Sequence, residues 1–151
     1  MRTLVIGSCT LDLAVRVPRL PAQGEDVNTR GLTASLGGMA YNVYNVLELF
    51  GTRPILGCPI GQGRFAGLVA GLLREQGREP IGVIPGLDNG LCLCLVDDTG
   101  ERSLISHHGA EYRFDPALFA GVDFAQVGWV YACGLELEDR DGGRIADFLE
   151  E

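Results

Sequence analysis

The sequence predicts an α/β domain of three layers, helices on both sides of a mostly parallel sheet, that also carries a small β-sheet lid. Continuous apolar runs, typical of parallel strands buried on both faces, alternate with segments of helical periodicity. A separate set of segments, at approximately 10–36 and 89–109, alternates polar and apolar side chains as half-exposed strands do. The 22 glycines fall mostly at the ends of apolar runs, as expected of short elements joined by tight turns.

Length and composition narrow the class of protein. A chain of 151 residues with 46% hydrophobic residues is expected to form one domain, 1–151, with a substantial core. Its net charge of −8 and the scattering of its 12 basic residues argue against binding to nucleic acid or an anionic membrane. The apolar run at the start is too short for a signal peptide, and no stretch reaches the length of a membrane span. We therefore expect a cytoplasmic protein.

The cysteines are expected to be buried free thiols. Their number is odd, each lies in or beside a strand-like apolar run, and no two have the Cys-x-x-Cys spacing of a metal or redox pair. They are Cys9, Cys58, Cys92, Cys94 and Cys133.

Three strands are predicted in the first quarter of the chain. A continuous apolar run predicts a buried strand over 3–9. Residues 11–17 alternate apolar and polar side chains and predict a half-exposed strand that ends before Pro18, and residues 26–36 predict a second exposed strand. The apolar side chains of 11–17 stand away from the main core, so we expect them to be exposed unless a second copy of the chain covers them.

A pair of glycines introduces the first predicted helix. Gly37 and Gly38 permit close backbone approach and precede a helix that runs to about Phe50. The free N–H groups at its start can bind a hydroxyl or an anion, and Asn42, off the apolar face, can reach back toward the glycines. The alternative is that the glycines form only a loop before a core helix and that Asn42 is solvated.

Strands and helices alternate through the rest of the chain. Periodicity and turn residues define each of them. In order they are a buried strand over 53–60, a helix over 65–76, a short strand over 80–84, a β-hairpin of 91–96 and 103–107, a helix start at Asp115-Pro116, a buried strand over 126–133, and a helix over 140–151 with Ile145, Phe148 and Leu149 inward.

Two further motifs admit competing interpretations. Residues 61–66 have the G-x-G-x-x-A form of a dinucleotide-binding loop, but no acidic residue ends a following strand at the required distance, so a turn that needs small residues is the simpler interpretation. Asp12 is a lone carboxylate just past the first buried strand, where ligands of open α/β sheets gather, although it could equally be a solvated charge. His107-His108 has no partner at ligand spacing and is interpreted as the end of the hairpin.

Taken together, these residues resemble the N-terminal half of the PfkB (ribokinase-like) family of sugar and nucleoside kinases. The family's first signature requires a glycine pair, an asparagine shortly after it and further glycines at set distances. The chain meets that spacing with Gly37, Gly38, Asn42, Gly51 and Gly61. The resemblance runs from residue 3 to the end, and implies a ribokinase-like three-layer fold with lid segments at 10–36 and 89–109.

The resemblance also implies a substrate site. In the family an aspartate soon after the first strand binds substrate hydroxyls, and the segment from Gly7 through Thr10 to Asp12 is similar to it. The glycine-pair segment, including Met39, would line the same site together with Asn42. Glu136, after the strand 130–134, would contact substrate there. The implied ligand is a sugar or nucleoside. Separately, the alternating apolar residues of the lid strands predict a homodimer through the lid.

The chain departs from the family in three places. Tyr44 stands where a small residue is usual, and Gln62-Gly63 replaces a frequent acidic pair. The second signature, Gly-Ala-Gly-Asp, which supplies the catalytic base, is absent, and so is the half that forms most of the ATP and Mg²⁺ site. We therefore expect catalytic residues only beyond Glu151 and an inactive isolated chain.

Three functions follow from these observations. The first is the substrate-binding half of an ATP-dependent sugar or nucleoside kinase, as a fragment or as one piece of a split protein. The second is a non-catalytic sugar-binding or dimerisation module of the same fold. The third, supported only by residues 61–66, is a dinucleotide-binding oxidoreductase.

Overall fold

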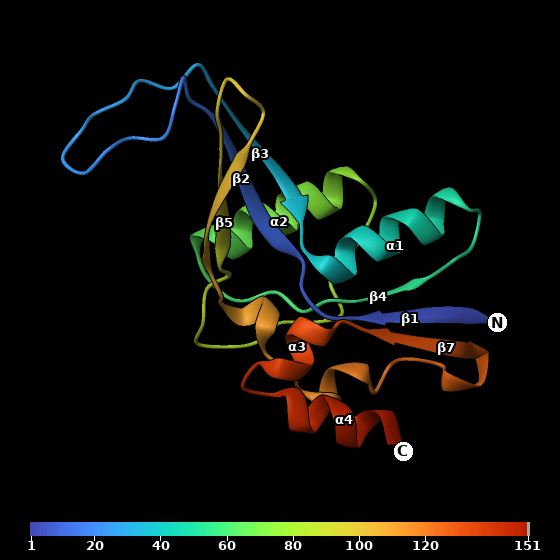
Figure 1. Cartoon of the computed structure of the whole chain (residues 1–151). Helices are drawn as coiled ribbons and strands as arrows, with labels where there is room; N and C mark the ends of the chain where they lie inside the picture. The colour runs from blue at the N-terminus through green and yellow to red at the C-terminus, as the bar shows by residue number, and fades with distance from the viewer. Residues whose placement is uncertain (151) are drawn as a thin grey trace.

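The computed structural model describes residues 1–150 and contains two β-sheets (Figure 1). The body of the domain has a parallel sheet, and a second, mixed sheet forms the lid. The parallel sheet has the strand order β4 (Ile55–Gly57), β1 (Arg2–Ile6), β7 (Val127–Ala132). The lid has the order β3 (Gly31–Gly37), β2 (Thr10–Arg16), β5 (Leu91–Val96), β6 (Arg102–His107).

Helices surround the parallel sheet, and short 3₁₀ turns connect the lid to the last strand. The α-helices are α1 (Met39–Leu49), α2 (Arg64–Glu75), α3 (Gly134–Glu138) and α4 (Gly142–Glu150). The 3₁₀ turns are η1 (Ala110–Tyr112), η2 (Pro116–Phe119) and η3 (Phe124–Gln126).

Strand β1 is the centre of the three layers. Its side chains alternate between the two faces of the sheet, so that Val5 packs into one core cluster with side chains of α1 and α2. Leu4 and Ile6 point the other way, into a second cluster that includes Ile145 of α4. Figure 1 shows α1 and α4 on opposite sides of β1. The predicted three-layer α/β/α arrangement is confirmed.

Arg78, just after α2, ties that helix to α1. Its guanidinium lies over the rings of Tyr41 and Tyr44, 5.3 and 5.0 Å from their centroids. It donates to the Tyr41 hydroxyl and the Asn45 side chain at 2.6 Å each, and to Glu48 at 2.5 Å. The large side chain of Tyr44 therefore takes part in the contact between α1 and Arg78, away from the start of α1.

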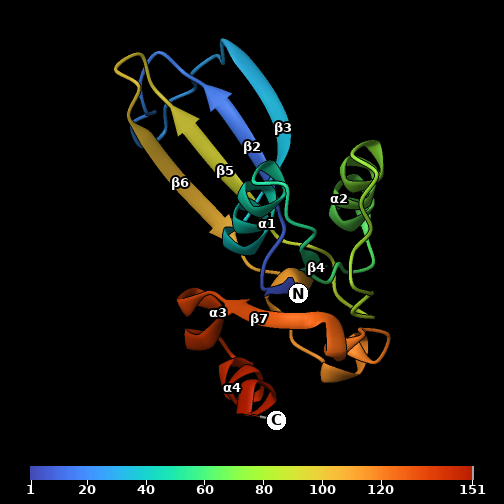
Figure 2. The same cartoon turned by 90° about the vertical axis from the view of Figure 1, so that its right-hand side faces the viewer.

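The lid packs one of its faces against α2. Leu11, Leu13 and Leu36 join the core cluster that contains Val69 of α2, and Leu11 is fully buried. The expectation that the apolar residues of 11–17 would be exposed without a second copy is wrong, because α2 already covers the base of the lid. Figure 2 shows the lid sheet standing away from the body, with α2 beside it.

Strand β7 is not the buried strand that its sequence predicts. It forms one edge of the parallel sheet, and Trp129 and Val130 are 76% and 41% exposed, because nothing within residues 1–150 covers that edge.

The ends of several other elements differ from the predictions. Strand β4 is shorter than 53–60, since Pro54 and Pro59 flank it, and the segment 80–84 makes only an isolated bridge between Val83 and Ile60. The final helix begins at Gly142, and Leu149 is 42% exposed where an inward position was expected.

The cysteines are free, as expected. Cys9, Cys58 and Cys133 are buried, but Cys92 and Cys94 on the lid strand β5 are only partly buried, so the expectation of burial is wrong for these two. Burial, reinforced by the carboxylates of Glu111 and Asp12, raises the pKa of the Cys9 thiol to about 12, which makes it unreactive at neutral pH. None of the helices within residues 1–150 has the length and apolar composition needed to cross a bilayer.

Candidate functional site

The connection from β1 to β2 passes directly over the start of α1. Gly38 has a φ of 94°, and a Cβ atom there would lie 2.5 Å from the carbonyl oxygen of Ser8. The backbone N–H of Tyr41 donates to that same oxygen at 3.2 Å. Only glycine combines this backbone conformation with so close an approach. The second glycine of the pair is thus required where the end of β1 meets the helix.

Asp12 is held over the first glycine of the pair. The hydroxyl of Thr10 donates to Asp12 Oδ1 at 2.8 Å, and a Cβ atom on Gly37 would fall 2.1 Å from Oδ2. Thr10 and Gly37 are direct partners across β2 and β3. Burial raises the pKa of Asp12, and the hydrogen bond from Thr10 opposes that rise. The carboxylate is therefore fixed in place and has capacity for a further donor.

Glu136 reaches the same connection from the opposite side. It lies in α3 and is 3% exposed, and its Oε1 accepts the backbone N–H of Ser8 at 2.9 Å. Its Oε2 is buried and has no hydrogen-bond partner within residues 1–150. With Gly7 and Tyr112 it lines an internal cavity of about 10 Å³, roughly enough for one water molecule. A buried carboxylate oxygen without a donor indicates a place for a polar group.

The structure thus brings Thr10, Asp12 and the glycine pair together and places Glu136 on the far side of Ser8. Met39 and Asn42 lie in the first turn of α1 with exposed side chains. The backbone N–H of Asn42 donates to the Gly38 carbonyl at 3.0 Å, which is an ordinary helical bond. The approach of the Asn42 side chain to Asp12 stays a prediction.

Glu111 holds the base of the lid, and the sequence analysis missed it. It is 1% exposed, and its two oxygens accept the backbone N–H groups of Gly90 at 2.8 Å and Gly109 at 3.0 Å. A Cβ atom on Gly90 would lie 1.9 Å from the carbonyl oxygen of His107. The glycines at both ends of the hairpin were the available signal, since their closely packed N–H groups need an acceptor.

The glycine-rich loop at 61–66 is closed by a carboxylate of the chain itself. Asp88 accepts the backbone N–H groups of Ala66 at 2.8 Å and Phe65 at 3.2 Å, at the start of α2. Burial tends to raise the pKa of Asp88, but these backbone hydrogen bonds hold it below its usual value. A dinucleotide would place its pyrophosphate where Asp88 lies. The glycines serve close packing, since a Cβ atom on Gly63 would lie 2.2 Å from Asp88 Cγ.

His108 is part of a link between the lid and the last two helices. Its ring is stacked on Tyr112 with centroids 3.7 Å apart, and Nδ1 lies 3.1 Å from Asp139 Oδ2. Asp139 is 31 residues away in sequence, so the spacing of the motif could not reveal it. Residues 1–150 contain no group of three or more potential metal-ligating side chains. The placement of His108 at the end of the hairpin agrees with the structure.

The chain matches a known protein family over most of its length. Residues 2–141 match the family described as pfkB family carbohydrate kinase. The Escherichia coli (strain K12) protein named Uncharacterized sugar kinase YegV is 29% identical over 148 residues, which cover 98% of this chain and 46% of that protein. The chain therefore spans about half the length of this curated relative.

Solved structures share the fold. Ribokinase from Giardia lamblia superposes with a TM-score of 0.72 and 22% identity, over 85% of this chain and 43% of that one. Fructokinase from Xylella fastidiosa gives a TM-score of 0.70 and 20% identity, over 97% and 47%. Ribokinase from Cryptococcus neoformans var. grubii serotype A, in complex with ADP, gives 0.66 and 23%, over 85% and 40%. By its match to the family over nearly its whole length, the chain belongs to the pfkB family of carbohydrate kinases.

Proposed function

We propose that this chain forms the substrate-binding and lid half of an ATP-dependent sugar or nucleoside kinase, and that the complete enzyme transfers the γ-phosphoryl group of ATP to a substrate hydroxyl. The observation that carries the proposal is the Asp12 carboxylate, fixed by Thr10 directly above Gly37 at the start of a helix. Carboxylate acceptors beside free helix N–H groups are suited to binding a polyhydroxylated ligand.

Each site residue has a defined part in this proposal. Asp12 accepts hydrogen bonds from substrate hydroxyls, and Thr10 keeps its carboxylate in position. The glycine pair lets the sugar approach the backbone, and Asn42 and Met39 contact the sugar from the first turn of α1. Glu136 uses its unpaired oxygen toward a polar group at the end of β1.

The ATP and Mg²⁺ site lies mostly in a second half of the enzyme. Phosphoryl transfer depends on positioning and on charge stabilisation around the phosphates, and needs a carboxylate to accept the hydroxyl proton. The Gly-Ala-Gly-Asp signature that supplies this base in the family does not occur in the sequence. We therefore expect residues 1–151 alone to bind substrate without phosphorylating it.

A non-catalytic sugar-binding or dimerisation module is the second candidate. The lid segments, approximately 10–36 and 89–109, would then be the dimerising surface. Exposed apolar side chains on the lid, such as Leu32 at 62% and Ile105 at 61%, support a homodimer through this sheet. An ATP-dependent phosphorylation assay with this chain, alone and with any downstream reading frame added, discriminates the two candidates.

Calorimetric titration with a panel of sugars and nucleosides tests the substrate site. A hydrogen bond to a charged group is worth roughly 1.5–3 kcal/mol, so Asp12→Ala should weaken binding at least about tenfold. Asp26→Ala, which removes the same charge from an exposed loop, is the control and should bind as the wild type does. Equal affinity of the wild type and Asp12→Ala would refute the assignment. Substrate-dependent ADP production by the purified chain, abolished by Asp12→Ala, would refute the division into halves.

A further inference from the structure

The lid face that carries Asp12 ends in two arginines. Side chains of β2 alternate between faces, and its pairing with β3 and β5 runs without a register shift, so Asp12, Ala14 and Arg16 share one face. Arg16 is the direct partner of Val96 on β5, and Val96 is the partner of Arg102 on β6. Arg16 and Arg102 therefore lie on the same face, two strand spacings or about 10 Å apart.

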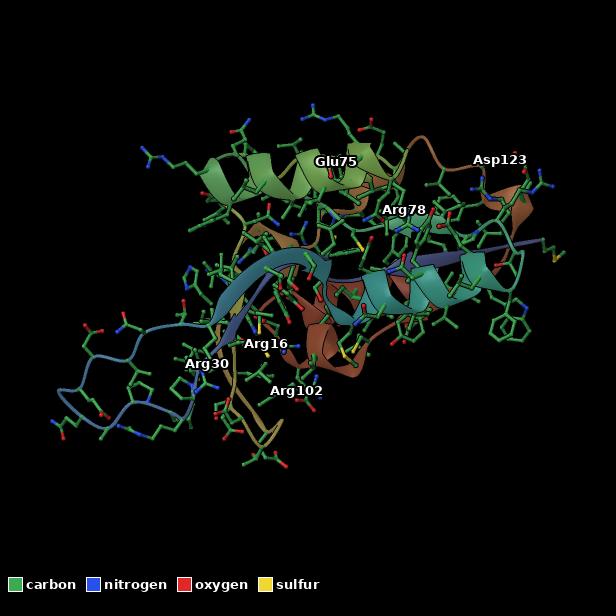
Figure 3. The ribbon with its side chains drawn as sticks, turned by 90° about the horizontal axis from the view of Figure 1, so that it is seen from above. Arg16, Arg30, Glu75, Arg78, Arg102 and Asp123 are labelled. Carbon is green, nitrogen blue, oxygen red and sulfur yellow. The ribbon has the colours of Figure 1, made fainter. Side chains whose placement is uncertain are left out.

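These two arginines carry charge that the rest of the chain does not neutralise. Both residues are exposed, and neither makes an ion pair within residues 1–150. The neighbouring Arg30 is paired with Asp98, with nitrogen–oxygen distances of 2.7 and 2.9 Å. Asp97 is turned into the hairpin loop, where its Oδ1 accepts three hydrogen bonds from that loop. Figure 3, seen from above, shows the three arginines gathered on the lid.

The surface between Asp12 and Arg16 is neutral and built of small side chains. Ala14 lies between them on β2, and its partner on β5 is Cys94. Four residues of strand separate the two charged positions by about 13 Å, at roughly 3.3 Å per residue. Long arginine side chains can shorten that span toward a ligand held at Asp12. At the end of the lid, Arg16, Arg30 and the hairpin turn at 97–100 line an open pocket of about 470 Å³.

We infer that the substrate is an anionic sugar, with a phosphate or carboxylate group that Arg16 and Arg102 bind while Asp12 binds hydroxyls at its other end. The inference rests on the proposed function, because it extends the same site along the lid. Guanidinium groups bind carboxylates and phosphates through paired, charge-assisted hydrogen bonds. A negatively charged protein that keeps two unpaired arginines on its ligand-facing sheet has the chemistry to select such a group.

Calorimetry with D-glucose, D-gluconate, D-glucose 6-phosphate and D-ribose 5-phosphate tests this. The wild type should bind at least one anionic sugar about tenfold or more tightly than glucose, with an advantage that declines as salt increases. The double variant Arg16→Gln/Arg102→Gln should lose most of that advantage while keeping its affinity for neutral sugar. Arg74→Gln, an exposed arginine on α2, is the control. Comparing D-gluconate with the two sugar phosphates shows whether the arginines bind a carboxylate or a phosphate group.

The outcomes distinguish this inference from the function on which it rests. Equal binding of neutral and anionic sugars, unchanged in the double variant, would overturn the inference alone. Failure of every sugar to bind would overturn the proposed function as well. If the double variant instead abolishes salt-dependent self-association in light scattering and leaves sugar binding unchanged, the arginines serve contact between copies and the inference is wrong. Circular dichroism melting of each variant verifies that it folds.

Discussion

Removal of the Asp88 carboxylate should destabilise the fold by releasing the start of α2. Asp88 accepts backbone N–H groups from Phe65 and Ala66, although it lies 22 or more residues further along the chain. It therefore acts as the N-cap of a helix to which it does not belong. Gly63, the residue at the ordinary cap position, has no side chain that could replace it.

The expected decrease in the free energy of unfolding is that caused by removing the N-cap of a helix. Replacement of an N-cap aspartate by alanine lowers the free energy of unfolding by about 0.5–2 kcal/mol. The upper end applies here because Asp88→Ala leaves the N–H groups of Phe65, Ala66 and Asn89 without this acceptor. For a domain of this size, about 2 kcal/mol corresponds to a decrease of roughly 4–8 °C in melting temperature. Asp88→Asn retains an acceptor oxygen and should cost about half as much.

Urea unfolding at neutral pH measures both variants, with Asp26→Ala on the exposed loop as the control for loss of charge. The pH dependence provides a second measurement. Because the pKa of Asp88 is lower in the folded state, its contribution is fully present above the ordinary aspartate pKa of about 3.9 and is lost as the pH falls below it. The stability difference between the wild type and Asp88→Asn should shrink in that range. A difference below about 0.5 kcal/mol for Asp88→Ala, or one that does not change with pH, would refute the capping role.

Three other substitutions test the packing around the site. Gly38→Ala should lower the free energy of unfolding by about 2–3 kcal/mol, because the position needs a positive φ and has no room for a Cβ atom. Gly67→Ala, in open space on α2, should instead raise the free energy of unfolding by about 0.5–1 kcal/mol, and urea titration compares the two variants. Arg78→Leu should lower the free energy of unfolding by about 2–3 kcal/mol, because its hydrogen-bond partners are left unpaired. Arg74→Leu, at an exposed position on α2, should change that free energy little, and thermal melting compares the two variants. Trp129→Ser should reduce any self-association without loss of stability, since that side chain is 76% exposed; unchanged association in sedimentation velocity would contradict this.

Features that depend on neighbours in sequence were predictable from the sequence. The alternation of side chains along 11–17 predicted that β2 has two different faces, and the apolar run at 3–9 predicted that β1 is a buried strand. The glycine pair predicted a close approach at the start of α1, which the position of Gly38 against Ser8 confirms. In each case the physical cause acts within one element or one turn, so the pattern of residue types carries it.

Features that depend on partners distant in sequence were not predictable. Strand β7 has the composition of a buried strand, but burial is decided by what stands beside it, and the structure leaves Val130 partly exposed. The lid was expected to need a second copy, because nothing in its sequence reveals that α2 folds against Leu11. Asp88 and Glu111 bind backbone groups of other segments, and no local pattern marks such acceptors.

Hydrogen-bond satisfaction separates the carboxylates that build this fold from those available to a ligand. Glu111 and Asp88 accept backbone N–H groups with both oxygens, and Asp141 accepts the N–H of Phe114 while it pairs with an arginine. These groups are saturated, so a ligand could bind them only by displacing structure. Asp12 accepts one hydrogen bond and Glu136 keeps an oxygen without any donor within residues 1–150. Since an unsatisfied buried oxygen is costly, its retention is best explained by a donor that arrives from outside the chain.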